Sequence, residues 1–430
     1  MSKYQKSLLY LEKLQKFGIK LGLEQTFELM EAVGSPHKKL KFIHIAGSNG
    51  KGSCGAMLNA CLKEEGFTTG FYSSPHLISP RERFRINGKA ICEDEFAELV
   101  FSLEPHAEKM ATAGRCPTYF EFTTTMAALC FMRNKIDFVI WETGMGGRFD
   151  STNVVDPVCS VITGISLDHQ QYLGDSIEKI AFEKAGIIKD NKPVILGKMP
   201  ETAKNVIYEQ AQLHNSEILN YAQQDIKHLK FDKEDAVWLQ HFDFDNCHVE
   251  LSLPGAMQRE NFRTVFSVLS YLSDKFCFSL KKSLAGLSKS KWPARCQILP
   301  GGIIIDGGHN IDGIKVLIKS LEEFIHDTKL PIIFGGFKDK DTLECIKLLE
   351  PLAEYFIFLQ LSTEFRPSWS GEELKAISQD ISSKKIYIAD TPEHALELCQ
   401  SSPIRLICGS LYLAGEFLYL LVSEDELLNI

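Results

Sequence analysis

Several patterns that mark particular classes of protein are missing from this 430-residue sequence. Its twelve cysteines are scattered singly, and no C-x-x-C pair occurs. A structural zinc site and a disulfide framework are therefore not expected, and reduced core thiols in a cytoplasmic protein are the better interpretation. Long apolar runs are also missing, including at the charged start of the chain. We therefore expect neither a secretory signal nor a transmembrane span.

Positive charge is in deficit. The sequence has 47 Lys and Arg against 56 Asp and Glu, which gives a formal net charge of −9. This balance argues against a general nucleic-acid or membrane-surface binder, although a local basic pocket for an anion remains open. Internal repeats and low-complexity tracts are absent as well. The remaining composition, 44% apolar and 24% charged, is that of an ordinary globular protein.

The most informative stretch is the glycine-rich segment 43–53, I-H-I-A-G-S-N-G-K-G-S. An apolar strand leads into it, and a helix is expected from near Ser53. Glycines such as Gly50 and Gly52 let the backbone curl, so that successive N–H groups point at an anion at the helix N-terminus. Lys51 suits the β and γ phosphates of a nucleotide, and Ser53 offers a hydroxyl to Mg²⁺. Because the spacing departs from the usual phosphate loop, a plain glycine-rich turn is the alternative.

The chain beyond this segment alternates between short apolar runs and helical stretches, which predicts an α/β fold with a parallel sheet. Residues 221–253 break the rhythm and suggest a small antiparallel excursion. A chain of this length favours two domains, and a linker at about 288–295 divides the chain into domains 1–290 and 296–430. The second domain is a smaller α/β unit. The expected strands lie at 41–46, 70–73, 138–143, 159–165, 193–197, 302–306, 330–335, 355–361, 386–389 and 406–409.

Polar side chains follow several predicted strands at their carboxyl ends, where ligands of parallel sheets gather. Glu142 is a natural Mg²⁺ ligand there, with turn capping as the alternative. His169 suits a metal or phosphate role, although a lone histidine is more often structural. The hydroxyl of Ser74 could complete a metal shell or cap a turn.

The second unit repeats this arrangement. Asp306 follows a strand and suits a ribose hydroxyl, with a helix N-cap as the plain alternative. Arg295, just past the linker, could reach a phosphate. In the first unit, Lys184 alone is interpreted as a solvated helix residue.

Taken together, these stretches resemble the folylpolyglutamate synthase and dihydrofolate synthase family, relatives of the Mur peptidoglycan ligases. The matching segments occur in the family's order and cover nearly the whole chain. They are 47–53, 72–77, 118–122, 142–153, 167–169, 183–189, 292–295, 306–310 and 338–341.

The resemblance implies an N-terminal P-loop ATPase domain like the Mur central domain and a C-terminal Rossmann-like domain. It also implies a reaction. ATP transfers its γ-phosphoryl group to a carboxylate of dihydropteroate or a reduced folate, and L-glutamate then displaces phosphate to form an amide. Two Mg²⁺ ions, with K⁺ as a further candidate, would support this chemistry in a monomer.

The resemblance also implies roles for particular residues. Lys184 corresponds to the family's carbamylated lysine, which requires a neutral amine that burial favours. The ATP phosphates would lie on Gly50, Lys51, Gly52 and Ser53, and Mg²⁺ on Ser74, Glu142 and His169. Asn261, Arg295 and Asp306 would complete the nucleotide site across the domain interface, with His309 assisting. The pterin-bearing substrate would lie near Leu21, Thr118, Phe120 and Arg148.

Two features bear on the acceptor. Lys20 stands where dihydropteroate-using members often have an acidic residue, whereas the segment 118–121 is closer to the dihydrofolate synthase form. We therefore expect a bifunctional enzyme, with a monofunctional folylpolyglutamate synthase as the alternative. A cell-wall Mur ligase would normally need a further N-terminal domain, and only about forty residues precede the loop. A nucleotide-dependent switch is disfavoured because no N-K-x-D motif occurs.

Overall fold

The structure is a computed structural model that describes residues 1–430 apart from 17, 19–21, 235–236, 324, 326–327 and 364–365. The chain groups into two compact units. The first contains residues 1–224, 260–286 and 428–430, and the second contains 225–259 and 287–427. Each unit has its own mostly parallel β-sheet, so the predicted α/β class is confirmed.

The first unit is built on an eight-stranded sheet in the order β4-β3-β2-β5-β1-β6-β7-β8. The pairs from β2 to β8 are parallel, and β3 and β4 form an antiparallel edge. Strand β1 is buried at every position, as expected for a central strand with helices on both faces. The strands of this eight-stranded sheet are β1 (Phe42–Ala46), β2 (Thr69–Tyr72), β3 (Phe84–Ile86), β4 (Lys89–Ala90), β5 (Phe138–Glu142), β6 (Pro157–Ile162), β7 (Val194–Leu196) and β8 (Ile218–Leu219).

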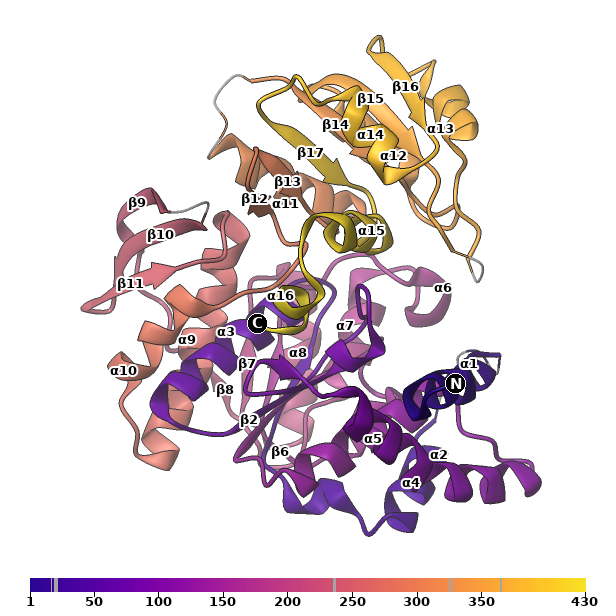
Figure 1. The fold of residues 1–430 in the computed structure, drawn as a ribbon. Coiled ribbons are helices and arrows are strands. Elements are labelled where there is room, and N and C mark those ends of the chain that lie inside the picture. The colour runs from indigo at the N-terminus through magenta and orange to yellow at the C-terminus, as the bar shows by residue number, and fades with distance from the viewer. Residues whose placement is uncertain (17, 19–21, 235–236, 324, 326–327, 364–365) are drawn as a thin grey trace. The chain divides into compact units, whose positions relative to one another are not determined.

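Helices cover this sheet, as Figure 1 shows. Helix α1 has an N-terminal capping box in which Ser2 and Gln5 satisfy each other's backbone amides. The helices are α1 (Lys3–Gln15), α2 (Glu24–Ala32), α3 (Lys51–Glu65), α4 (Glu93–Thr112), α5 (Tyr119–Arg133), α6 (Gln170–Leu173), α7 (Ile177–Ala185), α8 (Glu201–Leu213), most of α9 (Ala256–Phe276) and α10 (Leu280–Leu284). Short 3₁₀ helices are η1 (Pro36–Lys39), η2 (Pro80–Arg83), η3 (Ser151–Val154) and η4 (Ala285–Lys289), the last of which runs on into the second unit.

An aromatic core anchors the strand that ends at Glu142. Trp141 is fully buried, with its ring centroid 4.8 Å from that of Tyr72 and 5.1 Å from that of Phe42. Its indole N–H donates to the carbonyl of Thr152 at 2.9 Å, so the polar end of the side chain is satisfied as well. The site-bearing end of β5 is therefore held rigidly.

Several predicted boundaries were displaced by two or three residues; β15, for example, spans Ala353–Leu359 and not 355–361. Helix α3 begins at Lys51 rather than near Ser53. Strand β6 ends at Ile162, three residues before the predicted end at 165. Directly after the strand, the Thr163 hydroxyl donates to the carbonyls of Ala46 and Asn49 at 3.3 and 2.6 Å.

The second unit contains a six-stranded sheet in the order β12-β13-β17-β14-β15-β16, parallel except for β12. The strands are β12 (Gln297–Leu299), β13 (Ile303–Ile305), β14 (Leu330–Phe334), β15 (Ala353–Leu359), β16 (Lys385–Ala389) and β17 (Arg405–Cys408). The helices are α11 (Ile311–Glu322), α12 (Thr342–Leu349), α13 (Gly371–Ser378), α14 (Pro392–Leu398), α15 (Leu411–Leu421) and α16 (Glu424–Leu428).

The expected antiparallel excursion is a three-stranded sheet of β9 (Lys227–Glu234), β10 (Val237–Phe244) and β11 (Cys247–Leu251), whose strands lie side by side in Figure 1. By internal contacts it groups with the second unit, although the predicted first domain extends to 290. The predicted linker begins inside η4, and Ser290 within it is buried. The domain boundary stays a prediction. None of the helices in the described part of the chain combines the length and apolar character that a bilayer crossing requires.

Candidate active site

The phosphate-loop segment joins β1 to α3 in the first unit. Gly50 is the N-cap of α3 and adopts a left-handed backbone conformation with φ of 89°. The first turn closes where the amide of Cys54 donates to the carbonyl of Gly50 at 2.9 Å. Lys51, Gly52 and Ser53 are therefore the first three helical residues, whose N–H groups have no partner inside the helix. This is the backbone geometry that binds an anion at a helix N-terminus.

Asn261 of α9 lies against this loop. A Cβ on Gly50 would be 2.5 Å from the side-chain oxygen of Asn261, so any other residue would push the Asn261 side chain aside as well as impose an unfavourable backbone conformation. The Cys54 thiol lies 3.8 Å from the Asn261 carbonyl, across 207 positions of sequence. The predicted nucleotide-binding Asn261 therefore adjoins the predicted phosphate-binding glycine.

The loop is fixed by hydrogen bonds from hydroxyl groups that were not among the predicted site residues. Thr163 donates to the carbonyl of Asn49 at 2.6 Å. Ser48 donates to the carbonyl of Ser166 at 3.0 Å and accepts from its amide at 3.1 Å. From the sequence, Thr163 could be recognised as a hydroxyl residue at the end of a buried strand. The sequence does not show to which group that hydroxyl is hydrogen-bonded.

Two lysines converge on one backbone oxygen of the loop. The ammonium groups of Lys51 and Lys184 each donate to the carbonyl of Gly47 at 3.0 Å. Lys184 is only 3% exposed, so its interpretation as a solvated helix residue is wrong. Burial, reinforced by the charge of Lys51, lowers the pKa of Lys184 to about 7 against the opposing pull of Asp168 and Asp150. Near neutral pH this amine is thus neutral in a large fraction of molecules.

Glu142 ends β5 beside the loop. It lies opposite Ile45 of β1 in the parallel register, and its side chain is 5% exposed. One carboxylate oxygen is 4.0 Å from the Lys51 ammonium, and the other accepts from the backbone amide of Ser74 at 3.3 Å. The structure therefore brings together Ser74, Glu142 and Lys51. Buried carboxylate and hydroxyl oxygens are the donor types that Mg²⁺ prefers.

His169 lies in a more open position. It is the N-cap of α6 with φ of 51°, and its side chain is 42% exposed. Its Nε2 is 3.7 Å from a carboxylate oxygen of Asp168, a residue that is itself 9% exposed. The predicted metal-binding group of His169 with Glu142 stays a prediction.

The predicted substrate residues have different surroundings. Leu21 lies outside the described residues. Thr118 is buried as the N-cap of α5, where its hydroxyl accepts from the amide of Glu121 at 3.3 Å. Phe120 packs beneath the glycine-rich turn after β5, since a Cβ on Gly144 would lie 2.5 Å from its ring. Phe120 is therefore next to the turn that follows Glu142.

Arg148 follows the same turn and packs against α7. Its guanidinium carbon lies 4.1 Å from the ring centroid of Phe182, and it donates to the Gln210 side chain at 3.2 Å. Phe182 also borders a hollow of about 510 Å³ between α6, α7 and α8. Three carboxylates border this hollow, which disfavours an anionic ligand there. They belong to Glu178, Glu183 and Glu209.

In the second unit, Asp306 is almost fully buried after β13. Its two carboxylate oxygens accept from the amides of Cys296 and Gly308, each at 2.7 Å. Burial raises the pKa of Asp306, and the nearby charge of Arg295 partly opposes that rise. His309 lies two glycines further along the same loop, and its Nδ1 is hydrogen-bonded to the carbonyl of Gly307 at 2.9 Å. Asp306, Arg295 and His309 therefore form one group.

The alternative of Asp306 as a helix N-cap is wrong. Asn310 caps α11 and accepts from the amide of Gly313 at 2.7 Å. Asp306 instead fixes the backbone of its own loop.

The comparisons with known proteins agree with this geometry. Residues 45–269 match the model of the Mur ligase middle domain. The chain is 34% identical over 428 residues to dihydrofolate synthase/folylpolyglutamate synthase of Bacillus subtilis, with 96% of this chain and 98% of the relative covered.

Two solved structures are also similar. Folylpolyglutamate synthase of Mycobacterium tuberculosis, complexed with ADP and AMPPCP, has a TM-score of 0.87 at 26% identity and covers 98% of this chain and 99% of its own. A complex described as FPGS with AMPPCP and folate has a TM-score of 0.81 at 28% identity, with 98% and 100% covered. The extent of these matches shows that the chain belongs to the dihydrofolate synthase/folylpolyglutamate synthase family, with a Mur ligase middle domain.

Proposed function

We propose that this protein is an ATP-dependent ligase that adds L-glutamate to dihydropteroate and to the γ-carboxylate of reduced folates. The observation that supports it most strongly is the convergence of Lys51, Lys184 and Glu142 on the phosphate loop. The Bacillus subtilis relative is named for both activities, and similar solved structures hold ATP analogues and folate. Phosphoryl transfer requires positive charge to bind the phosphates and a carboxylate to hold Mg²⁺. Lys51 and Glu142, beside the N-terminus of α3, are groups of these two kinds.

The proposed reaction has two steps. A carboxylate oxygen of the acceptor attacks the γ-phosphorus of ATP, the bond to the β–γ bridging oxygen breaks, and ADP leaves. The neutral amine of glutamate then attacks the acyl carbon, the bond from that carbon to the phosphate oxygen breaks, and an amide forms as the amine loses a proton. In both steps the chain positions the reactants and balances negative charge.

Different residues of the loop would contact different parts of the nucleotide. The free N–H groups of Lys51, Gly52 and Ser53 and the N-terminus of α3 would bind phosphate oxygens. The Lys51 ammonium would supply a positive charge for the β and γ phosphates. Gly50 leaves room for both the phosphates and Asn261, which we assign to the nucleotide.

Mg²⁺ fits the oxygen donors of this site. Glu142 and Ser74 would hold it, and when bound it would shield the phosphate charges from one another. His169, beside Asp168, is proposed as a ligand for a second Mg²⁺ or as a phosphate contact. K⁺ is a further candidate cofactor.

Lys184 is proposed to be carbamylated. The ammonium first loses one proton. The neutral amine then attacks the carbon of CO₂, an N–C bond forms as one C–O π bond breaks, and a second proton is released from nitrogen, so that overall a cation becomes an anion. A pKa of about 7 supplies the neutral amine, and the change removes the repulsion between two ammonium groups at Gly47. The carbamate could then serve as a metal or phosphate partner.

Further residues complete the proposal. Arg295 and Asp306 are assigned to the nucleotide, with His309 assisting. Thr118, Phe120 and Arg148, together with Leu21, are assigned to the pterin-bearing acceptor. The monomeric state and the cytoplasmic location stay predictions.

The test measures ADP release with L-glutamate and each acceptor in turn. The proposal expects turnover with dihydropteroate and with a reduced folate, and none when glutamate or the acceptor is omitted. Turnover with the reduced folate alone would leave a monofunctional folylpolyglutamate synthase, and turnover with neither would overturn the ligase assignment. For Lys184, the Lys184→Ala variant is assayed with and without short carboxylates. An unimpaired variant would remove Lys184 from the mechanism.

A further inference from the structure

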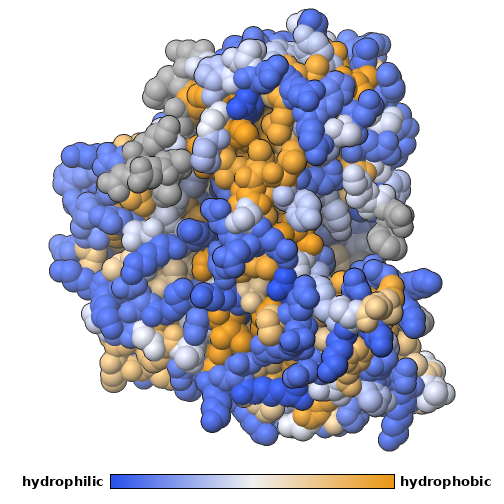
Figure 2. Space-filling model, in the orientation of Figure 1, coloured by the Kyte–Doolittle hydropathy of each residue, from blue (hydrophilic) through white to orange (hydrophobic). Residues whose placement is uncertain are grey.

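The three-stranded sheet β9–β11 separates apolar from polar residues on its two faces. In the antiparallel register of β10 and β11, His241 lies opposite Glu250 and Asp243 opposite His248. Because side chains alternate along a strand, these four share one face. The residues between them are buried on the other face, namely Gln240, Phe242, Phe244, Val249 and Leu251. Figure 2 shows mainly hydrophilic surface over this sheet.

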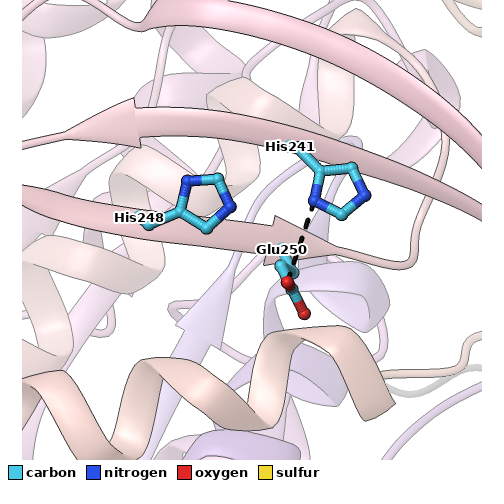
Figure 3. A group of neighbouring side chains, drawn as sticks. All are labelled: His241, His248 and Glu250. Atoms are coloured by element: carbon cyan, nitrogen blue, oxygen red, sulfur yellow. Dashed lines mark ion pairs between the residues drawn. The ribbon is translucent and has the colours of Figure 1, made fainter.

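Three of these side chains bring metal-ligand atoms together. His241, His248 and Glu250 each offer one ligand atom, and the three atoms lie within 4.8 Å of one another. The His241 Nδ1 is 3.8 Å from a carboxylate oxygen of Glu250, and the two imidazole rings are 5.9 Å apart with an angle of 24° between their planes. Figure 3 shows one nitrogen of His241 facing the Glu250 carboxylate, with the His248 ring on the other side of that carboxylate.

The separation is close to what a bound ion needs. Tetrahedral bonds of about 2.0–2.1 Å place ligand atoms roughly 3.4 Å apart. No pair of ligand atoms would therefore have to approach by more than about 1.4 Å. Side-chain rotation suffices for such a change, because His248 and Glu250 are exposed.

The outer nitrogen of each histidine faces a carboxylate. Asp243 lies 3.0 Å from Nδ1 of His248, and Asp232 lies 3.4 Å from Nε2 of His241. The hydrogen bond to Asp243 holds the proton on Nδ1 of His248 and leaves its Nε2 with a free lone pair. Nε2 of His241 makes no hydrogen bond among the described residues, so Asp232 acts on that ring only through its charge. His248 is therefore oriented by a carboxylate in the way that a metal-binding histidine often is.

Neighbouring cations do not block the site. Lys227 and Lys230 of β9 lie opposite Asp243 and His241 in the register, so they belong to the same face. Both side chains are exposed, and their long stems can keep the ammonium groups in water.

We propose that His241, His248 and Glu250 form a Zn²⁺ site that clamps β10 to β11, with water as the fourth ligand. Two imidazoles and one carboxylate with an open fourth position suit Zn²⁺ and disfavour Mg²⁺. The site lies in the second unit and uses none of the residues assigned to the ligase reaction. A test of this zinc site is therefore independent of the test of the proposed function.

The experiment is a Zn²⁺ titration of the untagged full chain in excess Mg²⁺, in competition with a chromophoric zinc chelator. The wild type is expected to bind one Zn²⁺ more than the His248→Gln variant, whose altered side chain is 60% exposed. Asp243→Asn should retain the site with affinity weakened about 10- to 100-fold. Far-ultraviolet circular dichroism checks that both variants fold.

The matched control is His214→Gln. His214 lies 2.6 Å from a carboxylate oxygen of Asp190, so it is a surface histidine with a single acidic partner. This variant should bind as much Zn²⁺ as the wild type. Equal binding by wild type and His248→Gln, including the case in which neither binds, would overturn the site, as would an equal loss in His214→Gln.

Discussion

At the scale of single residues, Lys184 has the most unusual environment near the loop. It is a lysine buried to 3% exposure that donates to a carbonyl already bonded by Lys51. An ammonium group in such a place is held at a cost in folding free energy, because it loses water and gains a repulsive neighbour. Groups whose pKa is shifted strongly by burial and by a neighbouring charge are more common in functional sites than elsewhere.

This cost gives a pH-dependent prediction. Folding releases the Lys184 proton between pH 7 and about 10.5, so wild-type stability should rise with pH across that window. Replacing Lys184 with Met removes the penalty, and the gain relative to wild type should be larger at pH 6 than at pH 9 by roughly 2 to 3 kcal/mol. Thermal unfolding in CO₂-free buffer measures it.

Lys179→Met is the control for this prediction. Lys179 is on the same helix but is exposed and paired with Asp175, so its replacement should show no such pH-dependent gain. A Lys184→Met effect that did not vary with pH would contradict the lowered pKa.

A second prediction at this scale concerns Gly50. Gly50→Ala forces a left-handed alanine and also drives Cβ to 2.5 Å from Asn261. Gly66→Ala imposes a left-handed alanine at φ of 105° with no atom within 4 Å of the new Cβ. The Gly66 variant should lose about 1–2 kcal/mol and the Gly50 variant more. Chemical denaturation compares the two, and equal losses would show that Asn261 does not crowd the loop.

At the scale of elements, the β9–β11 sheet is tied to α11 within the second unit by Arg259. This residue forms a bidentate pair with Glu323 at 2.9 and 2.6 Å and also donates to the buried Gln240 of β10. The Arg259 and Glu323 side chains are 13% and 22% exposed. The pair is therefore only weakly screened by solvent.

Arg259→Met is expected to destabilise the chain by about 2 kcal/mol, because the acid and the amide lose their shared donor. Arg366→Met is the matched control. Arg366 also forms a bidentate pair, with Asp339, but the two side chains are 35% and 46% exposed. Its loss should cost less than about 1 kcal/mol. Denaturant midpoints measure both, and a control effect as large as that of Arg259→Met would contradict the argument from burial.

At the scale of the whole molecule, ligand binding and folding are linked. If MgATP occupies the loop, the folded chain at about 100 times the dissociation constant gains roughly 2.7 kcal/mol. The unfolding midpoint should rise by about 2 to 5 °C. Lys51→Ala should abolish most of this rise. Lys204→Ala, which removes a surface lysine paired with Glu201, should retain it. A full shift in the Lys51 variant would separate nucleotide binding from that lysine.

The sequence by itself determined the α/β class, the strand–loop–helix unit around Gly50 and the polar residues at the ends of strands. It could do so because these features depend on local chemistry: short continuous apolar runs, glycine's missing Cβ and the direction of a parallel strand's carboxyl end. The strands predicted at 41–46 and 138–143 differ from β1 and β5 by at most one residue at either end.

Only the tertiary structure decided which of these residues meet. Lys184 considered alone is an ordinary helix lysine that only the family resemblance marked, and its contact with Gly47 spans 137 positions. The group of His241, His248 and Glu250 depends on the register of two strands, since a shift by one residue would turn the side chains of one strand to the opposite face. Burial, and with it the lowered pKa of Lys184, is produced by packing between distant segments, and no local pattern encodes it.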